Sequence, residues 1–460
     1  MLHKVGDFFI LCYNTSMKKI TIPQKANFII ERLLENNYEA YAVGGCIRDS
    51  LLERNPEDWD ITTSATPAEV KSLFKRTIDT GIKHGTVTIL LEKETFEVTT
   101  YRIDGKYEDS RHPTKVEFTK SLKEDLRRRD FTINAMAYNN REGLVDVFGG
   151  KEDLERKIIR CVGDAHKRLS EDALRILRGL RFSAQLGFAI EADTKEAMKE
   201  LVPLLKNISA ERIQVELIKT ITAPNPELLI LAYELGMTKE FLPEFDQMME
   251  TKQETIHHQY NVGIHTIEAM KNIAPEKVRR LTMLFHDMGK PAYKTMGEDG
   301  IAHFKKHNLG STKIAKEVLK RLRLDNDTIK KVEKLVYYHD YRMPTTPYHV
   351  RKAIYEIGKE LFPIYLEVRR ADTLAQSLYK RAEKLADIGK IENLYQEVLE
   401  KNQCVSLKEM AVSGKDLIKL GIKPGKQIGE ILEQLFKLVL KDPDLNKKEL
   451  LLQEVERSFL

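Results

Sequence analysis

Cysteine, tryptophan and long apolar runs are the features that this sequence has least of. Its 460 residues include four cysteines and one tryptophan. The cysteines are scattered without a C-x-x-C pair, which argues against a disulfide framework or a cysteine zinc site. No apolar run approaches the roughly 18 residues of a membrane span. The early segment VGDFFILCYN contains an aspartate and lacks a cleavage site, so we expect no signal peptide and a cytoplasmic protein.

The excess of charge of one sign is also small, because the formal net charge of the whole chain is only +5. Hydrophobic residues make up 42% and charged residues 32%, as in an ordinary globular protein. Such a mild basic excess permits a nucleic-acid partner without requiring one. The length exceeds what one hydrophobic core organises, so several domains are expected.

The stretch YAVGGCIRDSLLERNPEDWDITT carries the first chemical signal. A short apolar strand turns on Gly44 and Gly45 into a helix with Arg48. Paired glycines let the backbone approach a phosphate at a helix N-terminus. In an extended segment, Asp58 and Asp60 point to one face, where two carboxylates and a triphosphate suffice to bind magnesium. This pattern favours metal-assisted nucleotidyl transfer, although either motif alone also fits an ordinary turn or solvated loop.

In the order GG, RD, DWDI, these motifs resemble the nucleotidyltransferase superfamily that includes DNA polymerase beta. They are most similar to its transfer-RNA CCA-adding and poly(A) polymerase branch. The resemblance implies that Asp58 and Asp60 hold two Mg²⁺ ions about 4 Å apart. It also implies a third catalytic carboxylate, and Glu97 in a strand-like segment is the candidate. An outward-facing strand glutamate is the alternative for Glu97.

Two further segments supply candidate nucleotide-binding residues. The polar loop over residues 104–114 resembles the flexible loop of CCA-adding enzymes, and Arg111 either contacts the substrate or belongs to a solvated turn. The segment LRRRDFTINAMAY matches the second motif of the family. There, Arg128 and Arg129 are suited to clamping triphosphate oxygens with forked donors, and Asp130 accompanies them. Asn134 follows one turn later in an apolar stretch that we interpret as a helix, and it either binds nucleotide or has a structural role.

The third motif is EDALRILRGLR. Asp172 and Arg175 are three residues apart, so on a helix their side chains share one face, which Arg178 and Arg181 extend. An isolated pair of this kind is usually a weak surface salt bridge. The resemblance implies instead a protein-based nucleotide template. Cytosine and adenine both present an amine donor beside a ring-nitrogen acceptor, so a carboxylate and a guanidinium accept them and reject U and G, by roughly 1–3 kcal/mol for each bidentate contact.

Histidines become common in the second half of the chain and are accompanied by aspartates. Imidazole and carboxylate ligands suit manganese, iron, nickel or zinc. Their order resembles the HD phosphohydrolase superfamily, which implies that these residues bind metal and that phosphodiesterase or phosphatase activity accompanies them. His303 is an alternative to His307, and Asp340 forms a second HD dipeptide of open significance. The candidate ligands are His265, His286, Asp287, His307, His339 and Asp372.

We therefore predict an α+β chain that resembles bacterial transfer-RNA CCA-adding enzymes with an HD domain. A polymerase-beta-like α/β nucleotidyltransferase head comes first, then an all-α neck, an HD domain and a helical tail. The expected segments are a poorly ordered extension (1–20), the head (21–150), the neck with the template helix (151–245), the HD domain (246–390) and a tail that binds transfer RNA (391–460).

The resemblance implies transfer of CMP, CMP and AMP from CTP and ATP to the transfer-RNA acceptor end, with Mg²⁺ as cofactor and no membrane partner. Three alternatives stay open: an enzyme that adds only A, a poly(A) polymerase, and HD phosphohydrolysis as the main activity. A guanosine-polyphosphate synthetase–hydrolase would carry its two domains in the reverse order. The oligomeric state is not indicated by the sequence.

Overall fold

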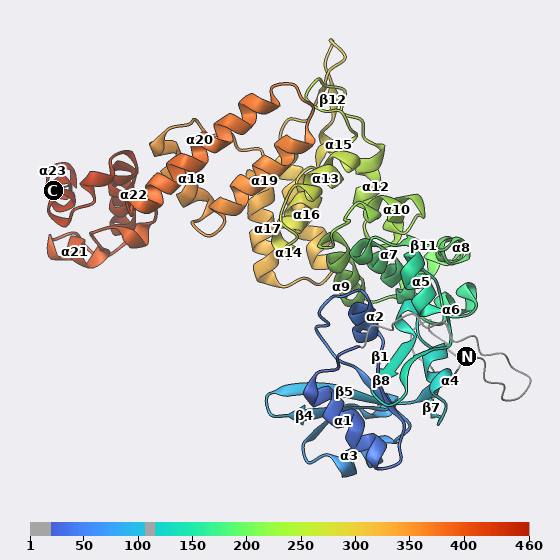
Figure 1. Ribbon diagram of the computed structural model, residues 1–460. Coiled ribbons are helices and arrows are strands. Elements are labelled where there is room, and N and C mark those ends of the chain that lie inside the picture. Colours follow the sequence, from blue (N-terminus) through green and yellow to red (C-terminus); the bar gives the residue numbers. More distant parts are fainter. Residues whose placement is uncertain (1–19, 106–115, 460) are drawn as a thin grey trace, which may run out of the picture. The chain divides into compact units, whose positions relative to one another are not determined.

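The computed structural model describes residues 20–105 and 116–459 (Figure 1). Arg111 and nearly all of the predicted extension 1–20 lie outside the described residues. The chain separates into two compact units, Met1–Gly179 with Phe188–Leu201 and Leu180–Gly187 with Val202–Leu460. We call them the first and the second unit and describe each by itself. The finer division into five segments stays a prediction.

A seven-stranded sheet organises the first unit. β2 and β5 run parallel, whereas the other neighbouring strands pair antiparallel. In sheet order the strands are β3 (Thr77–Gly81), β4 (Thr86–Leu91), β5 (Glu94–Thr100), β2 (Ile61–Thr63), β1 (Ala40–Val43), β8 (Met136–Asn139) and β9 (Gly143–Asp146).

Burial along the strands explains which side chains the sheet presents. Every residue of β1, β2 and β8 is buried, as expected of central strands covered on both faces. β5 alternates instead, with Phe96 and Val98 buried and Glu97 exposed between them. Asp60 directly precedes β2, so the sheet fixes the chain just beyond the two predicted metal carboxylates.

The predicted helix over residues 126–138 is wrong. Helix α4 (Leu122–Arg127) ends before it, a 3₁₀ turn spans Thr132–Asn134, and the stretch continues as β8 between β1 and β9. A continuous apolar run fits a buried strand as well as a buried helix, and periodicity alone does not separate the two. Pairing with β1 and β9 satisfies its backbone groups and decides the outcome.

Helices complete the first unit, together with short strand pairs β6–β7 (Arg102–Asp104, Val116–Phe118) and β10–β11 (Ile158–Ile159, Ala189–Ile190). Helix α7 (Leu174–Leu186) begins in this unit and ends in the other. The remaining helices of the first unit are α1 (Gln24–Glu35), α2 (Gly45–Leu51), α3 (Pro67–Leu73), α5 (Gly150–Arg156), α6 (Ala165–Glu171) and α8 (Ala192–Glu200).

The second unit is helical apart from the short hairpin β12–β13 (Thr295–Met296, Ala302–His303). Its helices up to residue 400 are α9 (Ala210–Ile221), α10 (Leu228–Glu234), α11 (Thr238–Phe241), α12 (Pro243–Glu250), α13 (Val262–Lys271), α14 (Lys277–Phe285), α15 (Lys290–Tyr293), α16 (His307–Arg321), α17 (Asn326–Tyr338), α18 (Pro347–Ile357), α19 (Phe362–Ala375) and α20 (Arg381–Glu400).

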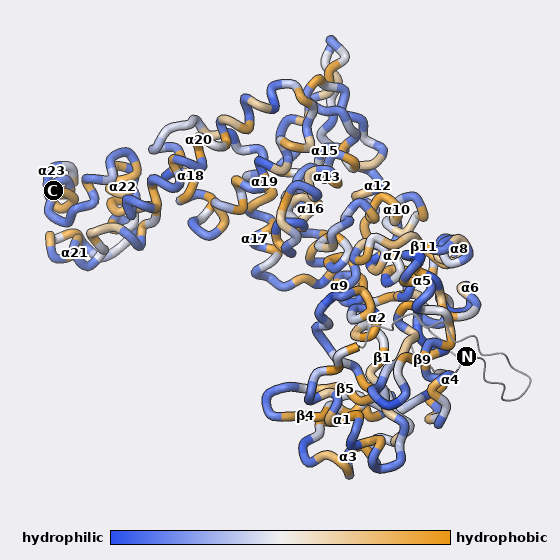
Figure 2. Tube along the Cα trace, viewed as in Figure 1, coloured by the Kyte–Doolittle hydropathy of each residue, from blue (hydrophilic) through white to orange (hydrophobic). Residues whose placement is uncertain are grey.

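Three more helices follow: α21 (Gly414–Lys419), α22 (Lys426–Lys441) and α23 (Lys448–Phe459). They share a core that includes Leu417, Leu435 and Val455. Figure 2 shows hydrophobic and hydrophilic residues alternating along these helices, as expected where one face packs into a core. Within the described part of the chain, no helix has both the length and the apolar character needed to cross a bilayer. The predicted α+β fold class is confirmed.

Candidate functional site

The backbone of the glycine turn between β1 and α2 lies close to the side chain of Arg129. Gly44 has a φ of 82° and a ψ of −128°, a conformation that favours glycine. A Cβ added to Gly44 would lie 2.8 Å from Nη1 of Arg129. The turn is pinned to the sheet because Gly44 N donates to Met136 O at 3.1 Å. Glycine at this position therefore allows the guanidinium of Arg129 to lie against the backbone.

The two predicted metal carboxylates, Asp58 and Asp60, are exposed in the segment between α2 and β2. Although Asp60 is open to solvent, desolvation by the surrounding chain raises its pKa, Arg129 lowers it, and the Asp58 carboxylate raises it further. Two carboxylates that oppose each other's ionisation suit a hard divalent cation, which would neutralise both. The Asp58–Asp60 pair thus fits magnesium by its donor chemistry.

Glu97 lies on the strand next to these carboxylates. The parallel register pairs Ile61 with Val98, so Asp60 and Glu97 each stand one position earlier on neighbouring strands. Among the described residues, however, Asp58, Asp60 and Glu97 do not form a group whose ligand atoms lie within 4.8 Å of one another. The third catalytic carboxylate stays a prediction.

A buried carboxylate that the sequence reasoning missed, Asp125, holds the arginine segment in place. Its Oδ1 accepts from Arg128 Nε at 2.9 Å, and its Oδ2 lies 3.7 Å from Arg129 Nη2. Thr62 on β2 also donates to Oδ2, at 3.1 Å. Burial alone would raise the pKa of Asp125, but Arg128 and Arg129 hold it below its usual range. The i, i+3 and i, i+4 spacings in EDLRR were the available signal.

A second polar network joins four predicted residues. Arg48 Nη1 donates to Asn134 Oδ1 at 2.8 Å, and Asn134 Nδ2 donates to Asp130 Oδ1 at 3.1 Å. Arg178 Nε donates to the other oxygen of Asp130 at 2.7 Å. Burial would raise the pKa of Asp130, but Arg178 and Asn134 hold it well below the usual range. The network links α2, the 3₁₀ turn and α7.

The predicted template pair does not share one helix, so the expectation of a common helix face is wrong. Asp172 follows the last residue of α6 with a φ of −137°, and its Oδ1 accepts from Leu174 N at 3.1 Å. Aspartate competes well for such free N–H groups at the start of a helix, which breaks the chain into α6 and α7. Arg175 is buried and donates from Nη2 to Arg128 O at 3.0 Å. It also pairs with Glu171, which the sequence reasoning missed.

Arg181 lies on the part of α7 that belongs to the second unit. Its Nη1 donates to Glu216 Oε1 of α9 at 3.1 Å. The predicted neighbour Arg178 pairs with Asp130 instead, so the two arginines serve different networks. A nucleotide-binding role for Arg181 stays a prediction.

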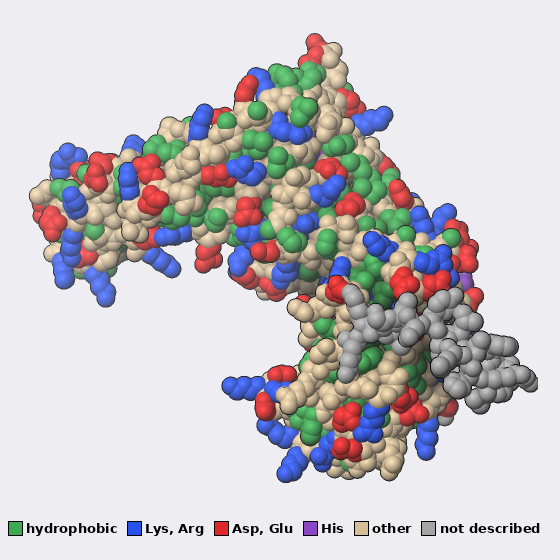
Figure 3. Space-filling view, in the orientation of Figure 1, with side chains coloured by type: hydrophobic (Ala, Val, Ile, Leu, Met, Phe, Trp, Pro, Cys, Tyr) green, Lys and Arg blue, Asp and Glu red, His purple; other side chains and the backbone are tan. Residues whose placement is uncertain are grey.

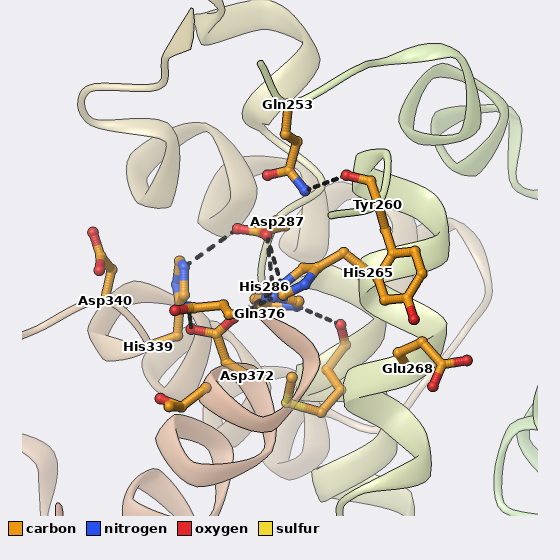
Figure 4. Close-up of polar contacts among 12 residues, drawn as sticks. Gln253, Tyr260, His265, Glu268, His286, Asp287, His339, Asp340, Asp372 and Gln376 are labelled. Carbon is orange, nitrogen blue, oxygen red and sulfur yellow. Dashed lines mark hydrogen bonds and ion pairs between the residues drawn. The ribbon is translucent and has the colours of Figure 1, made fainter. Parts of the chain in front are cut away.

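The six predicted HD residues come together in the second unit around Asp287, and Figure 4 labels all of them except His307. Asp287 Oδ2 lies 3.2 Å from His286 Nε2 and 3.6 Å from His265 Nε2. The other oxygen lies 3.2 Å from His307 Nε2 and 3.6 Å from His339 Nε2. Two groups of potential ligands therefore share one carboxylate, whose two oxygens face different histidine pairs.

Hydrogen bonds to backbone carbonyl groups fix the orientation of three of the imidazole rings. Nδ1 of His286, His307 and His339 lies 2.7, 2.8 and 2.7 Å from the carbonyl oxygens of Met283, Phe304 and Val336. An Nδ1–H donor leaves each Nε2 lone pair directed at the cluster, as metal ligation requires.

Buried polar atoms in the same cluster lack a hydrogen-bond partner. They are His286 Nε2 and both carboxylate oxygens of Asp287. The Lys290 ammonium, with Nζ 2.7 Å from Asp287 Oδ2, compensates part of this carboxylate, and the remaining acceptors are costly unless a further cation satisfies them. Asp372 completes the set, with Oδ1 2.9 Å from His265 Nε2. This donor set fits a transition metal, and its bridging carboxylate fits a pair of them.

The cluster opens into a polar cavity of about 350 Å³. Lys290, which the sequence reasoning missed, lines it with Nζ 2.7 Å from Asp287 Oδ2. The cavity also settles two alternatives. His303 is exposed and contributes no atom to either ligand group, whereas His307 does. Asp340 is exposed at the rim and pairs with Arg342, so Asp340 of the second HD dipeptide is not part of the cluster, whereas His339 is.

Comparison with known proteins gives matches along most of the chain. Residues 40–160 match the poly A polymerase head domain, and residues 301–455 match tRNA nucleotidyltransferase domain 2. Residues 187–249 match a model described as "Probable RNA and SrmB- binding site of polymerase A".

Two curated relatives and one solved structure are similar over nearly their full length. A CCA-adding enzyme of Enterococcus faecalis is 36% identical over 450 residues, which cover 96% of this chain and 98% of the relative. One of Streptococcus pyogenes serotype M3 is 37% identical and covers 91% and 94%. The crystal structure of the Bacillus stearothermophilus CCA-adding enzyme in complex with CTP aligns with a TM-score of 0.68 at 28% identity, covering 95% and 98%.

Proposed function

Because the chain belongs to the family of CCA-adding enzymes, we propose that it adds CMP, CMP and AMP to the 3′ end of transfer RNA from CTP and ATP. The observation that carries the proposal is the meeting of Gly44, Asp60 and Arg129, which come from three segments of the first unit. A nucleotidyltransferase needs a metal-binding carboxylate, a cationic clamp and a backbone that admits the triphosphate. A cytoplasmic location is part of this proposal, since its substrates are transfer RNA, CTP and ATP.

Asp58 and Asp60 are the residues that would hold Mg²⁺, with Glu97 on the adjacent strand as the third carboxylate. Bound there, the metal supplies activation of the attacking 3′-hydroxyl and neutralisation of the leaving pyrophosphate. The chain itself supplies the positioning. Arg128 and Arg129 are suited to clamp the triphosphate, and Asp125 holds both guanidinium groups from the buried side.

The Arg48–Asn134–Asp130–Arg178 network supports the other side of this site. Asp130 binds Arg178 and Asn134, and Asn134 in turn orients Arg48. Arg48, in the last turn of α2, is therefore held in a fixed direction by Asn134 and by Asp49, whose Oδ2 lies 2.8 Å from Arg48 Nη2.

Base selection is assigned to Asp172 and Arg175. A carboxylate accepts from the exocyclic amine that cytosine and adenine share, and a guanidinium donates to their ring nitrogen. Arg175 donates a hydrogen bond to the backbone carbonyl of Arg128, which joins the proposed template residue to the proposed triphosphate clamp. In this structure the Asp172 carboxylate accepts from Leu174 N, so contact with a base would require it to share or leave that bond.

Transfer RNA would be bound through its phosphates and shape, because every transfer RNA must be served. Lysine and arginine side chains stand out over α21 to α23 in the second unit (Figure 3). These three helices share a core and belong to the proposed tail, residues 391–460.

A second activity is favoured by the Asp287-centred cluster. We propose that it binds Mn²⁺, Fe²⁺, Ni²⁺ or Zn²⁺ and hydrolyses phosphoesters. His265, His286 and Asp372 would hold one ion and His307 and His339 the other, with Asp287 between them. The HD site would accompany nucleotidyl transfer rather than replace it.

The experiment uses transfer-RNA transcripts that end at the discriminator base, at C and at CC. Each receives labelled CTP, ATP or both, with wild type and Asp58→Ala. Ordered addition of C, C and one A, lost in the variant, is the expected result. Addition of A alone to the CC end would identify an A-adding enzyme, and unlimited A a poly(A) polymerase. No incorporation would leave HD phosphohydrolysis as the main activity.

A further inference from the structure

One side of the HD cavity is lined by Gln376, His257 and Arg342, which the ligand cluster does not use, and Lys384 contacts Gln376 and His257 without lining the cavity itself. We call Lys384, Gln376, His257 and Arg342 the cationic wall. Lys384 Nζ on α20 donates to Gln376 Oε1 at 2.7 Å and lies 3.5 Å from His257 Nδ1. Gln376 Nε2 donates to Asp372 Oδ2 at 3.1 Å. The wall is thus connected through Gln376 to a proposed metal ligand, yet lies beyond it.

The segment that carries His257 is fixed against the wall. Ser377 N donates to His257 O at 2.9 Å, and the rings of His257 and Tyr379 meet edge to face with centroids 5.1 Å apart. The two segments of the cationic wall that carry His257 and Gln376 are therefore held together by a backbone hydrogen bond.

Apart from the proposed metal ligands, the described residues that line the cavity include more cationic than anionic side chains. Asp287 and Asp372 would be occupied by metal, which leaves Asp340 as the remaining carboxylate among the lining residues that the structure describes. Asp340 is already paired with Arg342 at 3.3 Å. The cationic lining residues are Lys290, Lys305, Lys306 and Arg342.

The groups of the wall also repel one another. Burial, and then the Lys384 and Arg342 cations, lower the pKa of His257. Burial and Arg342 lower the pKa of Lys384, against an opposing effect of Asp372. An anion bound among these groups would reduce the electrostatic repulsion among His257, Lys384 and Arg342.

We propose that the cationic wall binds a second anionic group of the HD substrate, next to the phosphate that the metal cluster would hold. The inference rests on the proposed HD hydrolase function. The substrate class is a phosphate compound with two neighbouring anionic groups. Phe304 is the one Phe, Tyr or Trp among the described lining residues, and it already lies beneath Lys290 at 5.4 Å. Among the described lining residues, the cationic and polar side chains available to phosphates therefore outnumber the Phe, Tyr and Trp rings.

The first test measures binding without catalysis. The full chain is labelled with ¹⁵N-histidine, and the His257 resonance, assigned with His257→Gln, is followed while inorganic phosphate is titrated. Lys384→Met should weaken the apparent affinity at His257 about tenfold, because a charge-assisted hydrogen bond is lost. Lys390→Met is the matched control, since Lys390 is exposed on the same helix and pairs with Asp387. Phosphate that leaves His257 unshifted, or equal affinities in the two variants, would overturn the proposal.

The second test compares substrates with manganese-loaded protein. Lys384→Met should raise KM about tenfold for ADP and for a dinucleotide with a terminal 3′-phosphate. It should leave p-nitrophenyl phosphate, which has one phosphate, within twofold. An effect on ADP alone assigns the site to free diphosphates, and one on the dinucleotide alone to RNA ends. Equal effects on all three esters would overturn the inference. If wild type hydrolyses none of them while phosphate binding still depends on Lys384, the hydrolase proposal fails and the anion site stands.

Discussion

The two candidate sites of this chain are prepared for their ligands in opposite ways. In the first unit, Asp58 and Asp60 are exposed, whereas Asp125 and Asp130, the carboxylates that bind the neighbouring arginines, are buried. In the second unit, the proposed ligands converge on Asp287 and are buried, except for the partly exposed Asp372. The first arrangement suits a site whose metal arrives with a triphosphate. The second suits a metal that stays with the protein.

The largest expected effect would separate the two sites. Asp60→Ala should lower nucleotide incorporation by roughly 10³-fold or more, since transition-state charge loses its metal support. Asp287→Asn should leave incorporation within twofold and reduce bound transition metal, measured by elemental analysis, by at least one ion per chain. Loss of incorporation in a folded Asp287→Asn protein would show that the sites depend on each other.

The substitution Asp125→Asn tests whether this buried carboxylate positions Arg128 and Arg129. The change weakens the support of Arg128 and Arg129, so we expect kcat/KM for CTP and ATP to fall about 10- to 100-fold and the free energy of unfolding to fall by about 3 kcal/mol. Glu124→Gln on the same helix is the control, because Glu124 forms an exposed pair with Arg127. That variant should change stability by less than about 0.5 kcal/mol. Similar losses in both variants would contradict the role of Asp125.

The sequence predicted the HD ligands better than the environment of the nucleotidyltransferase residues. Metal ligands must be His and Asp, so His265, His286, Asp287, His307, His339 and Asp372 were visible as residue types in order. The break at Asp172 was not visible, because an aspartate at helical spacing serves equally in a helix and as a cap. The strand β8 was missed since a run buried on both faces has no period. Asp125 and Lys290 act through contacts that residue type alone does not reveal.

Acid should weaken the network around Asp130. Its pKa is lower in the folded chain than the unfolded value of about 3.9, so its stabilisation is complete above that pH and is lost as the pH falls below it. Asp130→Asn should therefore lower the free energy of unfolding by about 2 kcal/mol at pH 7 and by progressively less below about pH 4. Urea unfolding of both proteins between pH 7 and pH 3 measures the difference. A difference that stays constant with pH would contradict the assignment.

The smallest expected effect concerns the glycine turn and distinguishes backbone conformation from the contact with Arg129. Gly44→Ala and Gly143→Ala both place a Cβ at positive φ, 82° and 79°, but only the first meets a neighbour within 4 Å. Each should lower the free energy of unfolding by about 1–2 kcal/mol. Because Nη1 is the flexible end of Arg129, the added Cβ at Gly44 displaces the guanidinium rather than unfolding the turn. Gly44→Ala should therefore raise KM for CTP and ATP severalfold at a stability close to that of Gly143→Ala, measured by incorporation and urea unfolding. Equal KM values in the two variants would mean that Gly44 serves the backbone alone.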